Sequence, residues 1–214
     1  FESVDSADPD VHMLFKVGDD LRQDMLTLQI LKVMESLWLH EGLDLKMSLY
    51  STLALGNNVG LLEVVDSSST LAEIQKWGGG QIGVFNEKTL YKWLKQFEEP
   101  DSQENFIRSC AGYCVATYVL GIADRHNDNI MLKTSGHLFH IDFGHFLGYF
   151  KTKLGIKRET APFVFTPDMC YTMGGKKSEG YKQFQEYCVQ AYKVLNQNKR
   201  LLISLLALML CSGI

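Results

Sequence analysis

Two short polar segments carry the residues best suited to chemistry in this sequence. Residues 121–131 read Gly-Ile-Ala-Asp-Arg-His-Asn-Asp-Asn-Ile-Met, and residues 140–145 read His-Ile-Asp-Phe-Gly-His. Asn129 and Asp142 lie thirteen residues apart, and a hairpin between them can bring an amide oxygen and a carboxylate onto one hard cation. Mg²⁺ prefers such oxygen ligands together with the phosphate oxygens of a substrate. The pair is therefore a candidate magnesium site.

The first segment also offers groups that can orient or activate a nucleophile. Asp124 and His126 are placed to orient or deprotonate an attacking hydroxyl, and the sequence does not decide which of them takes the proton. Lys16, at the end of an early strand, is a candidate for binding phosphate oxygens, with Asp24 or Glu35 on the next helix holding it in place. A metal carboxylate, a metal amide, a positioning group and such a lysine are the parts of phosphoryl transfer from a nucleotide.

The elements that must position these groups follow from the hydrophobic periodicity. Residues 143–170 have no clean period, and the stripe over 201–210 predicts core packing unless the partners of that stripe are missing. The pattern predicts strands over 13–17, 43–55 and 60–65, a hairpin of 130–133 with 137–141, and helices over 21–40, 71–76, 90–97, 103–120, 178–195 and 199–211, with a cap for the second helix within 66–69.

Composition limits the class of protein. The chain has 214 residues, of which 46% are hydrophobic and 21% charged, as in ordinary globular domains. A net charge of −4 argues against a nucleic-acid-binding protein with a globally basic surface. No apolar run reaches the roughly 18 residues of a membrane-spanning helix. Five irregularly spaced cysteines and the lack of a signal-peptide pattern predict a reducing, intracellular setting.

Three separated motifs, in this order, resemble the catalytic domain of phosphoinositide 3-kinases. They are Phe15-Lys-Val-Gly-Asp-Asp-Leu-Arg-Gln-Asp24, Asp124-Arg-His-Asn-Asp-Asn129 and His140-Ile-Asp-Phe-Gly-His145, and the likeness extends over about 13–214. The order Asp-Arg-His separates this family from the protein kinases. The resemblance implies an α+β, two-lobed, protein-kinase-like lipid kinase fold. A partial small lobe would span 1–65, and a mostly helical large lobe would span 66–214.

The resemblance also implies a role for each matching residue. Lys16 would contact the phosphates of ATP, and Asn129 and Asp142 would hold Mg²⁺. Asp124 and His126 would serve the transfer itself, with His145 nearby. The remaining nucleotide-binding positions would be Asp24, Tyr50, Glu63, Val65, Met131 and Ile141, of which Glu63 and Val65 would offer backbone groups to the adenine.

A basic stretch after His145 is the candidate for substrate choice. It contains Lys151, Lys153, Lys157 and Arg158 and no acidic residue, and basic side chains pair with the phosphates of an inositol ring. It resembles the activation segment of class I enzymes, which implies phosphatidylinositol 4,5-bisphosphate as the substrate. The family usually continues Lys-Arg-Glu-Arg and then often Val, whereas this chain has Thr160 and Ala161.

Other hypotheses remain open beside that one. They are a class II-like or other phosphoinositide kinase, a protein serine/threonine kinase, and a non-catalytic nucleotide-binding fragment or scaffold. The basic segment argues against the protein kinase. The resemblance implies a cytoplasmic protein recruited peripherally to membranes, with a regulatory or adaptor subunit in the full-length protein. We find neither the family's upstream phosphate-binding loop nor its C-terminal helix, and we expect little activity from this piece alone.

Overall fold

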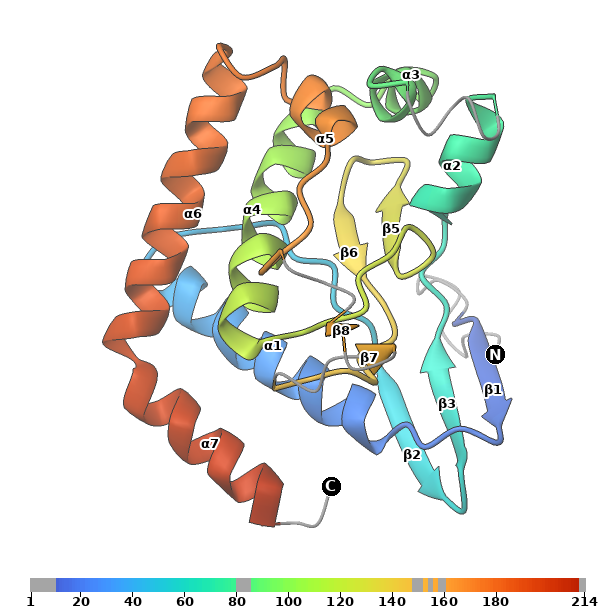
Figure 1. The fold of residues 1–214 in the computed structure, drawn as a ribbon, viewed down its shortest axis with the longest axis vertical. Coiled ribbons are helices and arrows are strands. Elements are labelled where there is room, and N and C mark those ends of the chain that lie inside the picture. The colour runs from blue at the N-terminus through green and yellow to red at the C-terminus, as the bar shows by residue number, and fades with distance from the viewer. Residues whose placement is uncertain (1–10, 80–85, 148–151, 154–155, 158–160, 212–214) are drawn as a thin grey trace.

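A three-stranded antiparallel sheet opens the fold (Figure 1). The computed structural model describes residues 11–79, 86–147, 152–153, 156–157 and 161–211. Strands β1 (Met13–Val17), β2 (Thr52–Gly56) and β3 (Val59–Glu63) pair in the order β1-β3-β2, which places Lys16 opposite Gly60. The turn between β2 and β3 uses Asn57 and Asn58, both at positive φ, a conformation that asparagine tolerates better than most residues.

Helix α1 (Arg22–His40) joins this sheet to the rest of the molecule. It contacts β2 on one side and the late helix α6 (Glu179–Gln197) on another. Its buried stripe ends in Trp38, whose indole N–H donates to the carbonyl of Ala191 at 3.0 Å. The helix stops before Gly42, at φ 74°, as the sequence predicts, because glycine accepts the left-handed conformation at a helix end.

A second sheet carries the hairpin on which the candidate site depends. Strand β4 (Ser68–Thr70) pairs with β5 (Ile130–Lys133), which pairs with β6 (Leu138–His140). Helix α2 (Leu71–Trp77) begins directly after β4, with a capping box between Thr70 and Glu73. The cap is thus Thr70, one residue beyond the predicted 66–69. Strand β3 belongs to the first sheet and β4 to the second, so the chain passes from one sheet to the other near residue 65. The boundary between two lobes at this position stays our prediction.

The larger part of the chain is helical and surrounds α4 (Ser102–Leu120). Nearly every side of α4 is buried, and it packs mainly against α6 and β6. The mixture of helices and sheets confirms the predicted α+β class. The remaining elements are α3 (Thr89–Lys95), β7 (Thr152–Lys153), β8 (Ile156–Lys157), α5 (Pro167–Thr172) and α7 (Lys199–Cys211).

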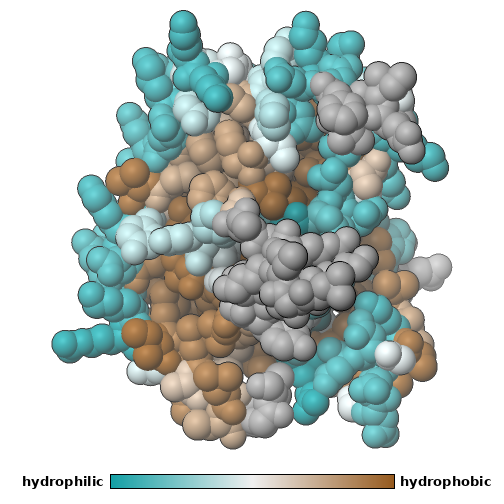
Figure 2. Space-filling model, in the orientation of Figure 1, coloured by the Kyte–Doolittle hydropathy of each residue, from teal (hydrophilic) through white to brown (hydrophobic). Residues whose placement is uncertain are grey.

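The structure adds to or corrects the periodicity at three places. Residues 43–51 form no strand; their apolar side chains enter the core, and regular pairing with β3 begins only at Thr52. Helix α5 lies in the stretch where the sequence has no clean period. In α7 Leu202 is buried, and Leu205, Leu206 and Met209 on the same face pack against the core. Ile203, Leu208 and Leu210 are exposed, so the predicted core packing holds for one face of the helix only. Figure 2 shows this apolar surface beside the polar outer side of α6.

No single helix of the described ranges has both the length and the hydropathy needed to cross a bilayer. Helices α6 and α7 meet that test only when they are taken together, and the chain bends by 70° between them.

Gly136 fixes the turn of the β5–β6 hairpin against α4. It adopts φ 90°, and a Cβ there would lie 1.9 Å from the carbonyl oxygen of Ser102. We expect Gly136→Ala to lower the free energy of unfolding by about 3 kcal/mol, because backbone strain adds to a clash with backbone that cannot yield. Gly175→Ala is the matched control, since Gly175 has φ 89° and open space around it. It should lose only about 1 kcal/mol. Equal losses in urea unfolding would refute the clash.

Candidate functional site

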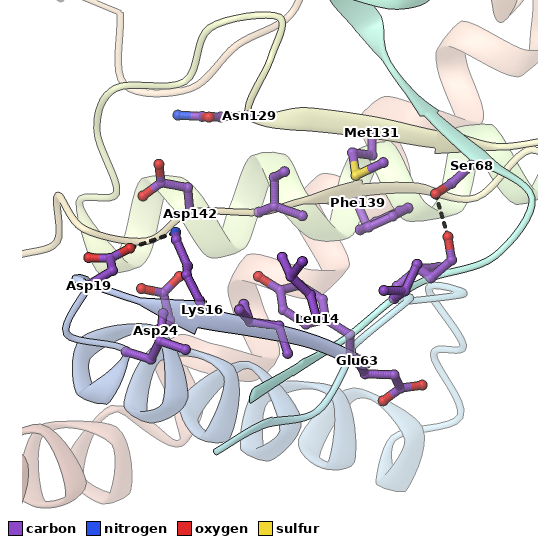
Figure 3. A pocket seen from close by; sticks show the side chains of 16 residues that line it. Leu14, Lys16, Asp19, Asp24, Glu63, Ser68, Asn129, Met131, Phe139 and Asp142 are labelled. Carbon is purple, nitrogen blue, oxygen red and sulfur yellow. Dashed lines mark hydrogen bonds and ion pairs between the residues drawn. The ribbon is translucent and has the colours of Figure 1, made fainter. Parts of the chain in front are cut away.

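A cavity of about 380 Å³ lies between the first sheet, α1 and the β5–β6 hairpin (Figure 3). All nine residues that the sequence predicts for nucleotide and metal binding line this cavity: Lys16, Asp24, Tyr50, Glu63, Val65, Asn129, Met131, Ile141 and Asp142. The lining also includes residues that sequence reasoning missed: Leu14, Asp19, Leu21, Leu62, Val64, Ser68 and Phe139.

The cavity has a charged end and an apolar end. Figure 3 shows Lys16, Asp19, Asn129 and Asp142 gathered at one end, while Met131, Phe139 and Ser68 lie toward the other. A nucleotide has the same division, with a flat apolar base at one end and charged phosphates at the other. The arrangement therefore suits a nucleotide better than a purely apolar ligand.

Lys16 lies among carboxylates at the charged end. Its ammonium group forms an ion pair with Asp19 at 2.6 Å. This hydrogen bond raises the pKa of Lys16, and the charges of Asp142 and Asp24 add to the effect, so the lysine stays protonated. Asp19, rather than the predicted Asp24 or Glu35, forms the ion pair with Lys16, while Asp24 contributes through its charge. The sequence could have indicated Asp19 as the partner of Lys16, since only the turn at Gly18 separates Asp19 from the strand.

Asp24 connects α1 to the Asp-Phe-Gly segment. Its carboxylate is buried and accepts a hydrogen bond from the backbone N–H of Phe143 at 3.0 Å. Burial raises the pKa of this carboxyl group, and the neighbouring charge of Asp142 acts in the same direction. Asp24 therefore fixes backbone at the charged end of the cavity in addition to lining the cavity wall.

Asn129 and Asp142 present oxygen atoms suited to a hard cation. The Asn129 amide nitrogen donates to the backbone carbonyl of Asp124 at 3.0 Å, which leaves its oxygen as the available ligand. The Asp142 carboxylate faces the cavity and accepts a long hydrogen bond, 3.3 Å, from the N–H of Gly144. The described residues contain no group of three or more His, Cys, Asp or Glu placed to hold a metal. One carboxylate and one amide fit Mg²⁺ bound jointly with phosphates.

The apolar end retains polar groups that a base can use. The N–H of Glu63 is already bound to the carbonyl of Ser51, and the carbonyl of Val65 accepts from the Ser68 hydroxyl at 2.6 Å. Any backbone contribution of Glu63 must therefore come from its carbonyl, and that of Val65 from its N–H. Nearer the charged end, beside Asp24 and Asp142, the Tyr50 hydroxyl is buried without a well-formed hydrogen bond among the described residues. A buried, unsatisfied hydroxyl in a cavity wall is a favourable place for a polar ligand.

The predicted transfer residues lie outside the cavity lining but next to its charged end. Asp124 is connected to Asn129 through its own carbonyl, and its side chain is largely covered. His126 is half-exposed, with Nε2 4.0 Å from the Asp124 carboxylate and Nδ1 accepting from the N–H of Asp128. The His145 carbonyl accepts from the N–H of Ala123 at 2.9 Å, which ties His145 to the same loop.

The predicted substrate-binding segment lies largely outside the description. Lys151 and Arg158 fall outside the described residues. Lys153 and Lys157 belong to β7 and β8, where their backbones pair opposite Ile156 and Thr152. The roles of all four basic residues stay predictions.

His140, at the end of β6, is buried close to the site. Its ring stacks on Tyr113 with centroids 4.8 Å apart, and its Nδ1 has no partner in the described part of the chain. Burial holds the pKa of His140 well below the usual value, with the charge of Arg125 acting in the same direction. The folded protein thus keeps His140 neutral at pH values at which the unfolded chain binds a proton.

This linkage predicts a loss of stability in mild acid. As the pH falls below about 6.5, the unfolded state takes up a proton that the folded state refuses, at up to about 1.4 kcal/mol per pH unit. His140→Phe keeps the ring stacked on Tyr113 and removes the titrating group. We expect the unfolding free energy of the metal-free wild type to fall more steeply between pH 6.5 and 5 than that of the variant. Parallel pH profiles would contradict this role.

Comparisons with known proteins agree with the geometry of the site. The model of the family "Phosphatidylinositol 3- and 4-kinase" matches residues 10–214. The chain is 54% identical over 215 residues to phosphatidylinositol 3-kinase 1 of Dictyostelium discoideum, a match to 98% of this chain and 14% of that protein. It is 47% identical over 221 residues to the human phosphatidylinositol 4-phosphate 3-kinase C2 domain-containing subunit beta, a match to 100% and 14% respectively. The chain thus spans about one seventh of these relatives.

Proposed function

Because the chain belongs to the phosphatidylinositol 3- and 4-kinase family, we propose that it is the catalytic part of an ATP-dependent phosphoinositide 3-kinase. The reaction transfers the γ-phosphoryl group of ATP to the 3-hydroxyl of an inositol ring. One observation carries the proposal: a single cavity gathers a phosphate-binding lysine, two oxygen ligands for a metal and an apolar wall.

The apolar end of the cavity binds the adenine. Met131 and Ile141 provide apolar contact with one face of the base, and the Val65 N–H donates a hydrogen bond to a ring nitrogen. The Glu63 carbonyl accepts from the exocyclic amine. These contacts set the orientation of the nucleotide, which places the phosphates at the charged end.

The charged end binds the phosphates. The Lys16 ammonium exchanges part of its contact with Asp19 for phosphate oxygens and stabilises their negative charge. Asn129 and Asp142 would hold Mg²⁺, with the amide oxygen and the carboxylate as ligands. The bound cation supplies neutralisation of the charge that develops on the transferred group.

Asp124 and His126 act on the attacking hydroxyl. The hydroxyl oxygen forms a bond to the γ-phosphorus, the bond to the oxygen that bridges the β- and γ-phosphates breaks, and ADP leaves. The hydroxyl proton passes to the Asp124–His126 pair, whose facing oxygen and nitrogen are 4.0 Å apart. His145 supports this loop through its backbone contact with Ala123.

We propose phosphatidylinositol 4,5-bisphosphate as the preferred lipid, since Lys151, Lys153, Lys157 and Arg158 offer four cations to its ring phosphates. Phosphatidylinositol 4-phosphate is the second candidate. It is favoured by the name of the human relative and by Thr160, which stands where the family usually has a further arginine. A cytoplasmic protein recruited to the membrane surface, with a regulatory or adaptor subunit, belongs to the same proposal.

The test is ATP-dependent phosphorylation of vesicles that carry one phosphoinositide at a time, using the full-length protein with Mg²⁺. Product analysis must find the new phosphate on the 3-position. Higher kcat/KM with phosphatidylinositol 4,5-bisphosphate supports the first substrate, and higher kcat/KM with phosphatidylinositol 4-phosphate supports the second. A folded protein that binds ATP but phosphorylates none of these lipids would refute the kinase proposal in favour of a nucleotide-binding scaffold.

A further inference from the structure

Arg125 is buried between the two segments that supply the candidate metal ligands. An arginine is rarely buried unless its guanidinium group is paired or hydrogen-bonded. It follows Asp124 in the first polar segment, and only 7% of its surface is exposed. It does not line the cavity, so it does not meet a nucleotide there. Its place in the site therefore depends on the contacts that its guanidinium group makes.

The guanidinium donates to backbone carbonyls of both segments. Its Nε binds the carbonyl of Ala123 at 2.9 Å, within its own loop. One terminal nitrogen binds the carbonyl of Ile141 at 2.7 Å, and the other binds the carbonyl of Asp142. A planar group with a fixed set of donors can join two chain segments in this way, whereas the single ammonium of a lysine cannot. Arg125 therefore holds the first polar segment against the Asp-Phe-Gly segment.

The segment that Arg125 holds has an uncommon backbone. Asp142 adopts φ 58°, a left-handed conformation that a residue with a Cβ adopts only at a conformational cost. Such a conformation persists where the surroundings fix it from several sides. Arg125 binds the carbonyls before and at this turn, and Asp24 binds the N–H of Phe143 directly after it. Two buried side chains of opposite charge thus fix the backbone on both sides of Asp142.

We propose that Arg125 is a positioning residue, which holds the Asp142 carboxylate in place for the cation by fixing the left-handed turn at Asp142 onto the loop of Asn129. The inference rests on the proposed function, because it assigns Arg125 to the metal end of the same cavity. The side chain acts through backbone carbonyls and touches neither nucleotide nor metal. Arg125 also makes a cation–π contact, with its guanidinium carbon 5.6 Å from the centre of the Phe143 ring. This contact holds the next residue of the same turn.

The first experiment measures the turn itself without metal or nucleotide. In the full-length protein, Arg125→Lys keeps the charge and loses the planar fork. Arg108→Lys is the matched control, since Arg108 also donates to a carbonyl, that of Asp44 at 2.9 Å, and neither residue lines the cavity. We expect faster hydrogen exchange of the backbone over 141–147 in Arg125→Lys alone. Unchanged exchange in that peptide would overturn the proposal.

The second experiment measures the binding of Mn²⁺ in the presence of ADP, by electron paramagnetic resonance. Residues that orient metal ligands typically contribute about 10–100-fold to metal affinity, so Arg125→Lys should weaken Mn²⁺ by about that factor. ADP binding without metal should not change, and in turnover kcat should fall while KM for ATP stays nearly constant. If Arg125→Lys fails to fold, Arg125→Gln, which keeps two donors, replaces it in both measurements.

The outcomes separate this proposal from the proposed function. Active wild-type protein with equal Mn²⁺ affinity in Arg125→Lys would overturn the positioning role and leave the kinase proposal intact. A folded wild type that binds no Mn²⁺ with ADP would overturn the kinase proposal and the metal-positioning role together. Loss of ADP binding as well as Mn²⁺ binding in Arg125→Lys would indicate a merely structural arginine.

Discussion

Asp142→Asn is expected to lower kcat for lipid phosphorylation by at least about 10³-fold while the protein stays folded and continues to bind ATP. The amide keeps the size of the side chain and an oxygen, but it removes the only carboxylate of the Asn129–Asp142 pair. A neutral ligand holds the cation less tightly and shields the developing charge less, and a factor of 10³ corresponds to about 4 kcal/mol in the transition state.

The Asp142 prediction is checked by steady-state kinetics and by ATP binding on the same preparations. Asp66→Asn is the control, because Asp66 is an exposed carboxylate after β3 that pairs with His12 and does not line the cavity. It should turn over as wild type does. The expected variant loses kcat, and its half-saturating Mg²⁺ concentration rises. Turnover of Asp142→Asn within about 10-fold of wild type would show that this carboxylate does not hold the catalytic metal.

Lys16→Met is expected to lower kcat/KM for ATP by about 10²–10³-fold. The methionine side chain keeps most of the apolar stem of the lysine and removes the charge that faces the phosphates. The loss should appear at every pH of the assay, because the pair with Asp19 raises the pKa of Lys16 and keeps the wild-type lysine charged throughout.

Two further variants make the lysine prediction specific. Lys32→Met changes an exposed lysine on α1 and should leave kcat/KM unchanged. Lys16→Arg keeps the positive charge and should therefore recover part of the activity. The recovery should be incomplete, because the compact ammonium group of lysine suits this confined position better than the larger planar guanidinium group. If Lys16→Met and Lys32→Met have equal kcat/KM, Lys16 does not bind the phosphates.

The exposed surface of α7 and the buried face of α4 illustrate how far periodicity alone can go. Both helices lie where the sequence predicts them, within one residue at each end. Periodicity reports that a helix forms and which side chains share a face. It does not report how much of the helix surface other elements cover. Nearly every side of α4 is buried, whereas only one face of α7, which carries Leu202, packs against the core.

The sequence by itself determined the α+β class, the family and nine of the residues that line the cavity. The class depends on strand and helix periods, and the family depends on short motifs whose order along the chain is specific. The resemblance to that family then implied which residues bind the nucleotide and the metal. The tertiary structure alone decided the contacts that hold those residues in place. Lys16 pairs with Asp19 across a turn, Asp24 binds a backbone N–H 119 residues away, and Arg125 reaches carbonyls 16 and 17 residues on.

The physical reason lies in the range of the forces that each level of structure reflects. A backbone dihedral or a hydrophobic period is set within a few residues, so the sequence displays it directly. A hydrogen bond between distant segments depends on how whole elements pack, and many packings are compatible with the same local pattern. The sequence therefore determined which groups could do chemistry, and the fold decided which neighbours hold those groups in a working geometry.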